Sequence, residues 1–126
     1  MNYYQRACEL KDETIVNRRY FHTNAEVGLN CDKTKAYVME KLSGYGIEPR
    51  DCGHGVIATL GAGSPVILLR ADMDALPMSE ESGEPFACPD GEHAHACGHD
   101  FHAAMLLTAA RMLKENEGEL KGTVKL

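Results

Sequence analysis

An uninterrupted apolar segment, Val66-Ile67-Leu68-Leu69, is the feature that most restricts the fold of this chain. A short continuous apolar run bounded by turn residues is typical of a strand covered on both faces, as in the sheet of an α/β protein. Gly63-Ser64-Pro65 precedes the run, and Asp72 follows it closely. Ligands of open α/β sheets bind beyond the carboxyl ends of strands, so a site is expected from Asp72 onward.

Helical patterns lie on both sides of this segment. Residues 4–22 contain no Gly or Pro and space apolar side chains on one side, which predicts an amphipathic helix. A second helix is expected over residues 33–42, with Asp32 or Thr34 as its N-cap, and a third over residues 100–115. The side chains expected to face inward are Ala7, Leu10, Ile15, Tyr20, Ala36, Val38, Met39, Leu42, Ala104, Leu107, Ala110 and Met112 or Leu113.

Short apolar runs separated by glycines predict further strands. One is expected around Ile47 and another over Val56–Leu60, and the two can pair as a hairpin through Gly53-His54-Gly55. A last strand is expected from Gly122, whereas residues 78–98 lack periodicity and predict a long loop. This order of helices and strands predicts an α/β fold with a mixed sheet flanked by helices.

Composition limits the partners of the chain. The net charge is -6 and no basic cluster is present, so nucleic acid is not an expected partner. No apolar run reaches the roughly 18 residues that cross a bilayer, and the polar N-terminus does not read as a signal peptide, so no membrane partner is expected. The five cysteines are an odd number without the spacing of a disulfide framework, which predicts reduced thiols and a cytoplasmic location.

The segment from Ala71 to Ala110 has a distinctive charge pattern. It contains no Lys or Arg, but eight acidic residues and four of the six histidines. Asp72 and Asp74 stand at alternate positions just after the predicted strand, where a cation or a histidine would relieve their repulsion. The pair can equally cap a loop or stay solvated. The segment as a whole predicts affinity for a cation.

The nature of that cation is indicated by residues 93–102, which read HAHACGHDFH. Cys97 and His99, separated by one glycine, can turn toward one point from a loop, and thiolate and imidazole are preferred ligands of zinc and neighbouring divalent metals. The dipole of the following helix favours the Cys97 thiolate. Asp100 can cap that helix or orient an imidazole. Cys97 and His99 are therefore the predicted metal ligands.

Other roles are open to these residues. Cys97 can be a buried thiol without a ligand role, and His99 can be a non-ligand. A Cys97–His99 nucleophile pair is disfavoured, because catalytic Cys and His are normally far apart in sequence. The other histidines are not predicted as ligands, and are expected to be exposed or substrate-facing (His93 and His95), packed or capping (His102), or ordinary surface residues (His22 and His54).

Longer stretches of the chain resemble a known family. LLRADMDALPMSEESGEPFA, from Leu68, and HACGHDFHAAMLLTAARML, from His95, resemble the M20 metallopeptidases and specifically their amidohydrolase branch. That branch includes N-acyl-amino-acid amidohydrolases, hippurate hydrolases and hydrolases of auxin conjugates. IVNRRYFHTNAEVGLN, from Ile15, also resembles the branch, although Asn24-Ala25 stands where relatives usually have a proline.

The resemblance implies part of an α/β/α zinc-peptidase-like catalytic domain, with a dinuclear metal centre that hydrolyses the amide bond of N-acyl amino acids or peptide-like substrates. By position, Cys97 and His99 match metal ligands, and Asp74 matches the aspartate that supports a metal-site histidine. Asp72 stands where most relatives outside the branch have a ligating histidine, and its role stays open. The implied metals are zinc, manganese, cobalt or nickel, which polarise a carbonyl and lower the pKa of a bound water.

The resemblance also implies that residues 1–126 are an incomplete N-terminal part of that domain. In the family, a strand resembling Gly122–Leu126 leads to a glutamate general base, further ligands and a smaller lid and dimerisation domain. We therefore expect the chain alone to bind metal weakly, to be inactive, and to self-associate through exposed sheet edges. The alternative is a small non-enzymatic metal-binding domain, or a pseudoenzyme that completes its fold with another chain.

Overall fold

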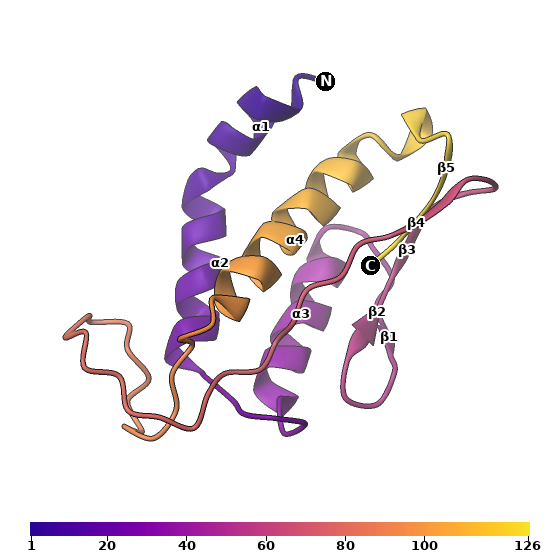
Figure 1. Cartoon of the computed structure of the whole chain (residues 1–126). Helices are drawn as coiled ribbons and strands as arrows, with labels where there is room; N and C mark the ends of the chain where they lie inside the picture. Colours follow the sequence, from indigo (N-terminus) through magenta and orange to yellow (C-terminus); the bar gives the residue numbers. More distant parts are fainter.

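A computed structural model describes all of residues 1–126 as helices packed against a small mixed sheet (Figure 1). The four α-helices and five strands, with a short 3-10 helix at Glu117–Glu119, are α1 (Tyr3–Glu9), α2 (Lys11–Thr23), α3 (Asp32–Gly44), β1 (Arg50–Asp51), β2 (Val56–Ile57), β3 (Thr59–Ala62), β4 (Val66–Leu68), α4 (His99–Glu115) and β5 (Gly122–Lys125). The predicted α/β class with a mixed sheet is confirmed. None of the helices combines the length and the apolar character needed to cross a bilayer.

The single helix expected over residues 4–22 is wrong in one respect, because the chain turns at Leu10 and forms α1 and α2 instead. Leu10 adopts φ -90° and ψ 4°, and its N–H bonds back to the carbonyl groups of Arg6 and Cys8. The turn buries the Leu10 side chain. A leucine favours a helix, so packing rather than helical propensity decides this position.

The second helix is present as α3, but its N-cap is Cys31, not Asp32 or Thr34, and Ala36 does not face inward as expected. Ala36 is exposed, whereas Thr34 is buried. The Glu26 carboxylate caps the start of the helix in place of a residue of the helix itself, since its Oε1 accepts hydrogen bonds from the Thr34 backbone N–H at 2.7 Å and from the Thr34 hydroxyl at 2.8 Å. Leu42 is buried as predicted.

Helix α4 lies between α2 and α3 and is central to the core (Figure 1). Its buried side chains include Ala104, Leu107 and Ala110, which confirms the predicted inward face. They pack with Phe21 of α2 and Leu60 of β3, among other buried residues. Small alanines on α4 let its neighbours approach closely, so α4 is fixed on two sides.

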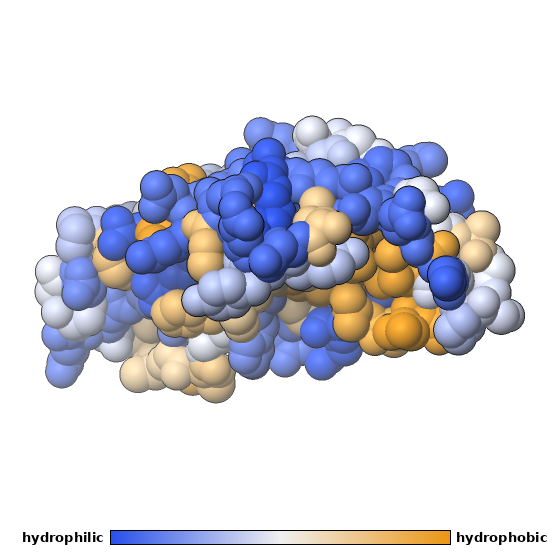
Figure 2. Space-filling model, turned by 90° about the horizontal axis from the view of Figure 1, so that it is seen from above, coloured by the Kyte–Doolittle hydropathy of each residue, from blue (hydrophilic) through white to orange (hydrophobic).

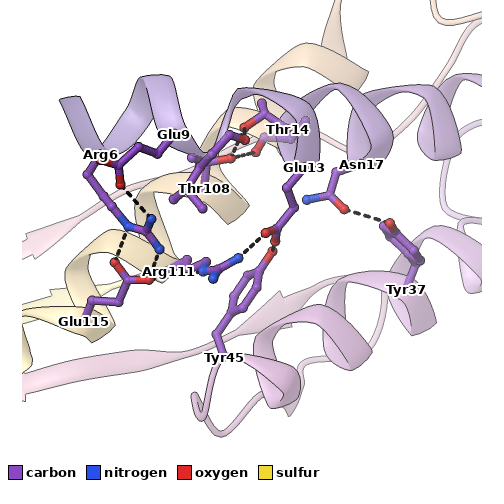
Figure 3. Close-up of polar contacts among 12 residues, drawn as sticks. Arg6, Glu9, Glu13, Thr14, Asn17, Tyr37, Tyr45, Thr108, Arg111 and Glu115 are labelled. Atoms are coloured by element: carbon purple, nitrogen blue, oxygen red, sulfur yellow. Dashed lines mark hydrogen bonds and ion pairs between the residues drawn. The ribbon is translucent and has the colours of Figure 1, made fainter. Parts of the chain in front are cut away.

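Polar contacts join α1 to α4 and α2 to both α3 and α4 (Figure 3). The Arg6 guanidinium donates two hydrogen bonds to Glu115, at 2.8 and 2.7 Å. Two hydroxyls, of Thr14 and Thr108, lie 2.6 Å apart, and the Tyr37 hydroxyl donates to the Asn17 Oδ1 at 2.7 Å. Another group joins three elements, because the carboxylate of Glu13 accepts from both Arg111 and Tyr45.

The main sheet has the order β3-β5-β4, with β5 antiparallel to β3 and parallel to β4. The strand predicted from Gly122 is confirmed as β5, at the centre of the sheet. Two glycines permit the strands to meet here. A Cβ atom on Gly61 would lie 2.3 Å from the Gly122 carbonyl oxygen, and one on Gly122 would lie 2.3 Å from the Pro65 carbonyl oxygen. Both glycines also have positive φ, at 69° and 133°.

The predicted hairpin is present in a shorter form. β1 and β2 pair antiparallel, with Arg50 opposite Ile57. Ile47 is buried as a core residue but lies before the first strand, not within it. The run expected over Val56–Leu60 is divided at Ala58, which exchanges two hydrogen bonds with Leu126 in register with the β3–β5 pairing, whereas β2 pairs with β1.

The strand at Val66–Leu69 is present as β4, but the expectation that both of its faces are covered is wrong. Val66, Ile67 and Leu68 are 58%, 53% and 67% exposed. β4 is an edge strand bonded only to β5, and no helix is in extensive contact with it. Apolar surface gathers at the side of the molecule where the sheet lies, on a largely hydrophilic surface (Figure 2). A cavity of about 370 Å³ opens nearby, lined among others by Leu68, Leu69 and Leu106.

Candidate metal centre

The chain leaving β4 runs extended toward the start of α4, and backbone pairing fixes its path. The Ala75 N–H donates to the Glu26 carbonyl oxygen at 2.7 Å. Leu76 and Ala94 exchange two hydrogen bonds, at 2.9 and 3.0 Å, which brings both ends of the long loop together. Residues 78–98 form that loop without a helix or strand, as predicted. The pairing places Asp72 and Asp74 next to the first turn of α4.

The imidazole ring of His99 contacts both of these aspartates, one at each ring nitrogen. Its Nδ1 lies 2.8 Å from the Asp74 backbone oxygen and 3.1 Å from the Asp74 Oδ1. A carbonyl oxygen can only accept, so Nδ1 carries the hydrogen. The other ring nitrogen, Nε2, lies 3.3 Å from the Asp72 Oδ2. Asp74 thus fixes the orientation of the imidazole and leaves Nε2 toward Asp72.

The spacing between His99 Nε2 and Asp72 Oδ2 fits two ligands of one metal ion. Metal–nitrogen and metal–oxygen distances of about 2.0–2.2 Å in a tetrahedral site place the two ligand atoms about 3.4 Å apart. The other Asp72 oxygen, Oδ1, lies 2.6 Å from Arg70 in an ion pair whose geometry is not that of a hydrogen bond. Asp72, whose role the sequence left open, is therefore the acidic side chain nearest the free nitrogen of His99.

Cys97 lies on the turn just before α4 and is exposed. Gly98, with φ 84°, makes the N-cap of the helix and separates Cys97 from His99. Nowhere in the chain do three or more His, Cys, Asp or Glu side chains converge as a ready metal-binding group. The donors near α4 fit a divalent metal in kind, and His99 with Asp72 fits in spacing, but Cys97 is not drawn in with them.

A second cluster, built on α2, lies against the same turn. Asp100 is fully buried, and its Oδ2 accepts from the Arg18 Nε at 2.8 Å and lies 2.7 Å from the His22 Nδ1. His22 itself is only 5% exposed, so the expectation of an ordinary surface histidine is wrong. Arg18 and His22 are four residues apart on one face of α2, a spacing that could have indicated a shared polar partner.

The long loop closes over this cluster. The His22 Nε2 contacts the Glu80 carboxylate, and the Thr23 hydroxyl donates to the Phe86 carbonyl oxygen at 2.8 Å. The Arg18 guanidinium lies 5.1 Å from the centre of the Phe86 ring. Burial opposes ionisation of Glu80, but hydrogen bonds from Ser82 and His22 outweigh it and lower the pKa of Glu80. Loop and helix α2 are thus joined by charge as well as by packing.

The remaining histidines differ in environment. His95 is buried, contrary to the exposed alternative, and neither of its ring nitrogens has a hydrogen-bond partner. Burial lowers the pKa of His95. The His93 Nδ1 lies 2.7 Å from the Asp90 carboxylate at the surface. His102 is exposed, not packed, and its ring centre lies 5.8 Å from that of His99; His54 is exposed, as expected.

The amino-acid sequence of the chain is similar to those of known proteins. Residues 68–126 match the model of peptidase family M20/M25/M40. The N-acetyl-L-cysteine deacetylase of Bacillus subtilis (strain 168) is 42% identical over 121 residues, covering 93% of this chain and 29% of that protein. The N-acyl-L-amino acid amidohydrolase of Geobacillus stearothermophilus is 37% identical over 121 residues, covering 93% of this chain and 33% of that protein.

A solved structure shares the fold. The Bacillus subtilis YXEP protein, described as a dinuclear metal binding peptidase from the M20 family, superposes with a TM-score of 0.87 at 38% identity, covering 90% of this chain and 33% of that one. Residues 68–126 therefore match the M20 peptidases in sequence, and most of the chain shares the fold of an M20 member. The relatives that align with most of the chain are named as a deacetylase and an amidohydrolase, and the chain spans about a third of the length of the curated relatives it matches.

Proposed function

We propose that residues 1–126 supply part of the metal centre of an amidohydrolase that cleaves the amide bond of N-acyl amino acids. The observation that carries this proposal is the position of His99, held by Asp74 at Nδ1 with Nε2 facing Asp72 at 3.3 Å. Two relatives named for deacetylation of N-acetyl-L-cysteine and hydrolysis of N-acyl-L-amino acids support the substrate class.

Each side chain has a distinct task in this proposal. Asp74 keeps the hydrogen of His99 on Nδ1, so that Nε2 is free to bind a metal. Cys97 supplies a thiolate, which the N-terminus of α4 favours. Asp72 contributes a carboxylate oxygen as a further ligand. A metal bound here would polarise the scissile carbonyl and activate a water.

The donor types narrow the metal to a borderline divalent ion. Thiolate and imidazole favour zinc, cobalt or nickel, whereas carboxylate oxygen also suits manganese. We propose two ions in the complete centre, as the description of the Bacillus subtilis YXEP protein indicates for that relative. In the isolated chain only His99 and Asp72 are at ligand spacing, so metal binding is weak and turnover is negligible.

A chimera tests the proposed activity. Residues 1–126 replace the matching segment of the Geobacillus stearothermophilus amidohydrolase, and hydrolysis of N-acetyl amino acids is measured with zinc, cobalt, manganese or nickel. We expect hydrolysis that chelator abolishes and that Cys97→Ala or His99→Ala reduces at least about tenfold, with His93→Gln as the unaffected control. A folded, metal-loaded chimera without hydrolysis contradicts the proposal. Chelator-sensitive turnover by the isolated chain contradicts its inactivity.

We also propose that the isolated chain self-associates through β4. The occupant is β4 of a second copy, because this edge has unpaired backbone groups and three consecutive exposed apolar side chains. An edge of this kind is a template for strand pairing between chains. The cavity beside Leu68 and Leu69 adds apolar surface to the same side.

A further inference from the structure

We propose that His22 is a positioning residue for the metal-binding turn, acting through Asp100 on His99. This inference rests on the metal role of His99 proposed above, and it assigns a task to a residue of α2 that lies outside the donor cluster. His22 and Asp100 are 78 positions apart in the chain but only 2.7 Å apart at the His22 Nδ1 and Asp100 Oδ2 atoms.

Asp100 is held on all sides. Its Oδ2 accepts from Arg18 and faces His22, while its Oδ1 accepts from the Phe101 backbone N–H at 2.9 Å. The residue has no exposed surface. A buried carboxylate that loses one partner must move or find another, because an unpaired buried charge is strongly unfavourable. The place of Asp100 is therefore set by the two side chains of α2.

His99 depends on that place because it precedes Asp100 in the first turn of α4. Backbone geometry in a helical turn is shared, so a shift of Asp100 rotates His99 as well. The His99 ring has contacts at both nitrogens, with Asp74 on one side and Asp72 on the other. A rotation of the first turn disturbs both distances, and ligand sites tolerate little misplacement.

His22 lies between two carboxylates, so its two contacts can be removed separately by substitution. Nδ1 faces Asp100 in α4, and Nε2 faces Glu80 in the long loop. The amide nitrogen of Asn lies close to the position of Nδ1, and that of Gln close to the position of Nε2. His22→Asn therefore keeps the link to Asp100, whereas His22→Gln keeps only the link to Glu80.

The first measurement needs no metal. Side-chain ¹⁵N spectra of the 126-residue chain report the tautomer of His99, whose hydrogen the Asp74 backbone acceptor assigns to Nδ1. We expect the wild-type signal in His22→Asn and a shifted, broadened or mixed signal in His22→Gln. The matched control is His93→Gln, since His93 and Asp90 form another histidine–carboxylate pair, at the surface. Circular dichroism establishes that each variant retains its helices.

The second measurement is a titration with Co²⁺, followed by the thiolate-to-cobalt charge-transfer absorption. His22→Gln should bind Co²⁺ at least about tenfold more weakly than wild type, with His22→Asn within about threefold of it. If His22→Gln loses its helices, Arg18→Met is measured instead, because it removes the other side-chain donor to Asp100, and the same loss of Co²⁺ affinity is expected.

The outcomes separate this inference from the proposed function. A folded His22→Gln with the wild-type His99 signal and Co²⁺ affinity overturns the inference, and so does a His22→Asn that behaves like His22→Gln. If wild type gives no thiolate absorption but the His99 signal still shifts only in His22→Gln, positioning by His22 stands. In that case Cys97 is not a ligand of Co²⁺ in the 126-residue chain, and the chimera tests its role in the complete centre.

Discussion

The Nδ1 atom of His99 lies 2.8 Å from the backbone oxygen of Asp74 and 3.1 Å from its side-chain Oδ1, so a single residue holds the imidazole by two acceptors. The backbone contact fixes which nitrogen carries the hydrogen. The side-chain contact adds a negative charge, which makes Nε2 a stronger ligand. The two effects can be separated by mutation, because only the second is lost with the carboxylate.

We expect Asp74→Ala to weaken Co²⁺ binding by about tenfold, at the low end of the loss usual for outer-shell partners of a metal ligand, because the backbone acceptor remains. Competition with a chromophoric chelator measures the affinity. His102→Ala is the control, since its ring is near His99 but has no contact with Asp74. Equal affinities of wild type and Asp74→Ala would remove Asp74 from the proposed centre.

The packing of the core around α4 predicts a large loss of stability when a buried side chain of this helix is replaced by alanine. Leu107 is 4% exposed and packs within the main apolar cluster, so Leu107→Ala should lower the free energy of unfolding by about 2–5 kcal/mol. Met105 lies on the same helix and is 54% exposed, so Met105→Ala should change it by less than about 0.5 kcal/mol. Urea unfolding followed by circular dichroism compares the two. A similar loss in both variants would contradict this packing of α4.

The exposed edge at β4 predicts concentration-dependent association. Ile67→Lys should weaken it by about tenfold or more, since a charged edge strand resists pairing. Val16→Lys places the same charge on an exposed apolar residue of α2 and should leave association unchanged. Sedimentation velocity over a range of concentrations measures both. A wild-type chain that remains monomeric throughout that range would refute pairing at β4.

The Arg6–Glu115 pair predicts a loss of stability in acid. Hydrogen bonds from Arg6, the largest cause, lower the pKa of Glu115 below its ordinary value of 4.5. The unfolded chain therefore takes up this proton first as the pH falls, so the contribution is present above about pH 4.5 and is lost as the pH falls through the lowered pKa. Arg6→Gln should be slightly less stable near neutral pH and should lose less stability in acid. The midpoints of urea unfolding of wild type and Arg6→Gln, measured from neutral pH to below pH 4.5, test this expectation. An equal loss of stability in acid for both proteins would contradict it.

Sequence patterns predicted those parts of the fold that depend on local periodicity. Ala104, Leu107 and Ala110 recur at helical spacing, and they are buried. The break at Leu10 could not be predicted, because no glycine or proline marks it and the contact of α1 with α4 is a tertiary one. The prediction that both faces of β4 are covered was wrong for a related reason. An apolar run predicts a strand, but it does not show whether other elements pack on the faces of that strand.

The sequence predicted the candidate metal ligands better than the residues that hold them in position. Cys97 and His99 stand out as metal-binding residue types close together in sequence. The long-range partner His22 does not, because its contact with Asp100 depends on how α2 and α4 pack. The burial of His95 likewise follows from tertiary packing, and alternation with alanine in a loop carries no sign of it.

The central place of β5 has a consequence for how the chain acquires its structure. β3 and β4 are close in sequence but do not pair with each other, and both bond to a strand that follows α4. During synthesis the two early strands leave the ribosome without a partner, and they must wait for Gly122–Lys125 before the sheet can form. α2, α3 and α4 can pack earlier, so sheet formation is expected to be the slow, aggregation-exposed step of folding.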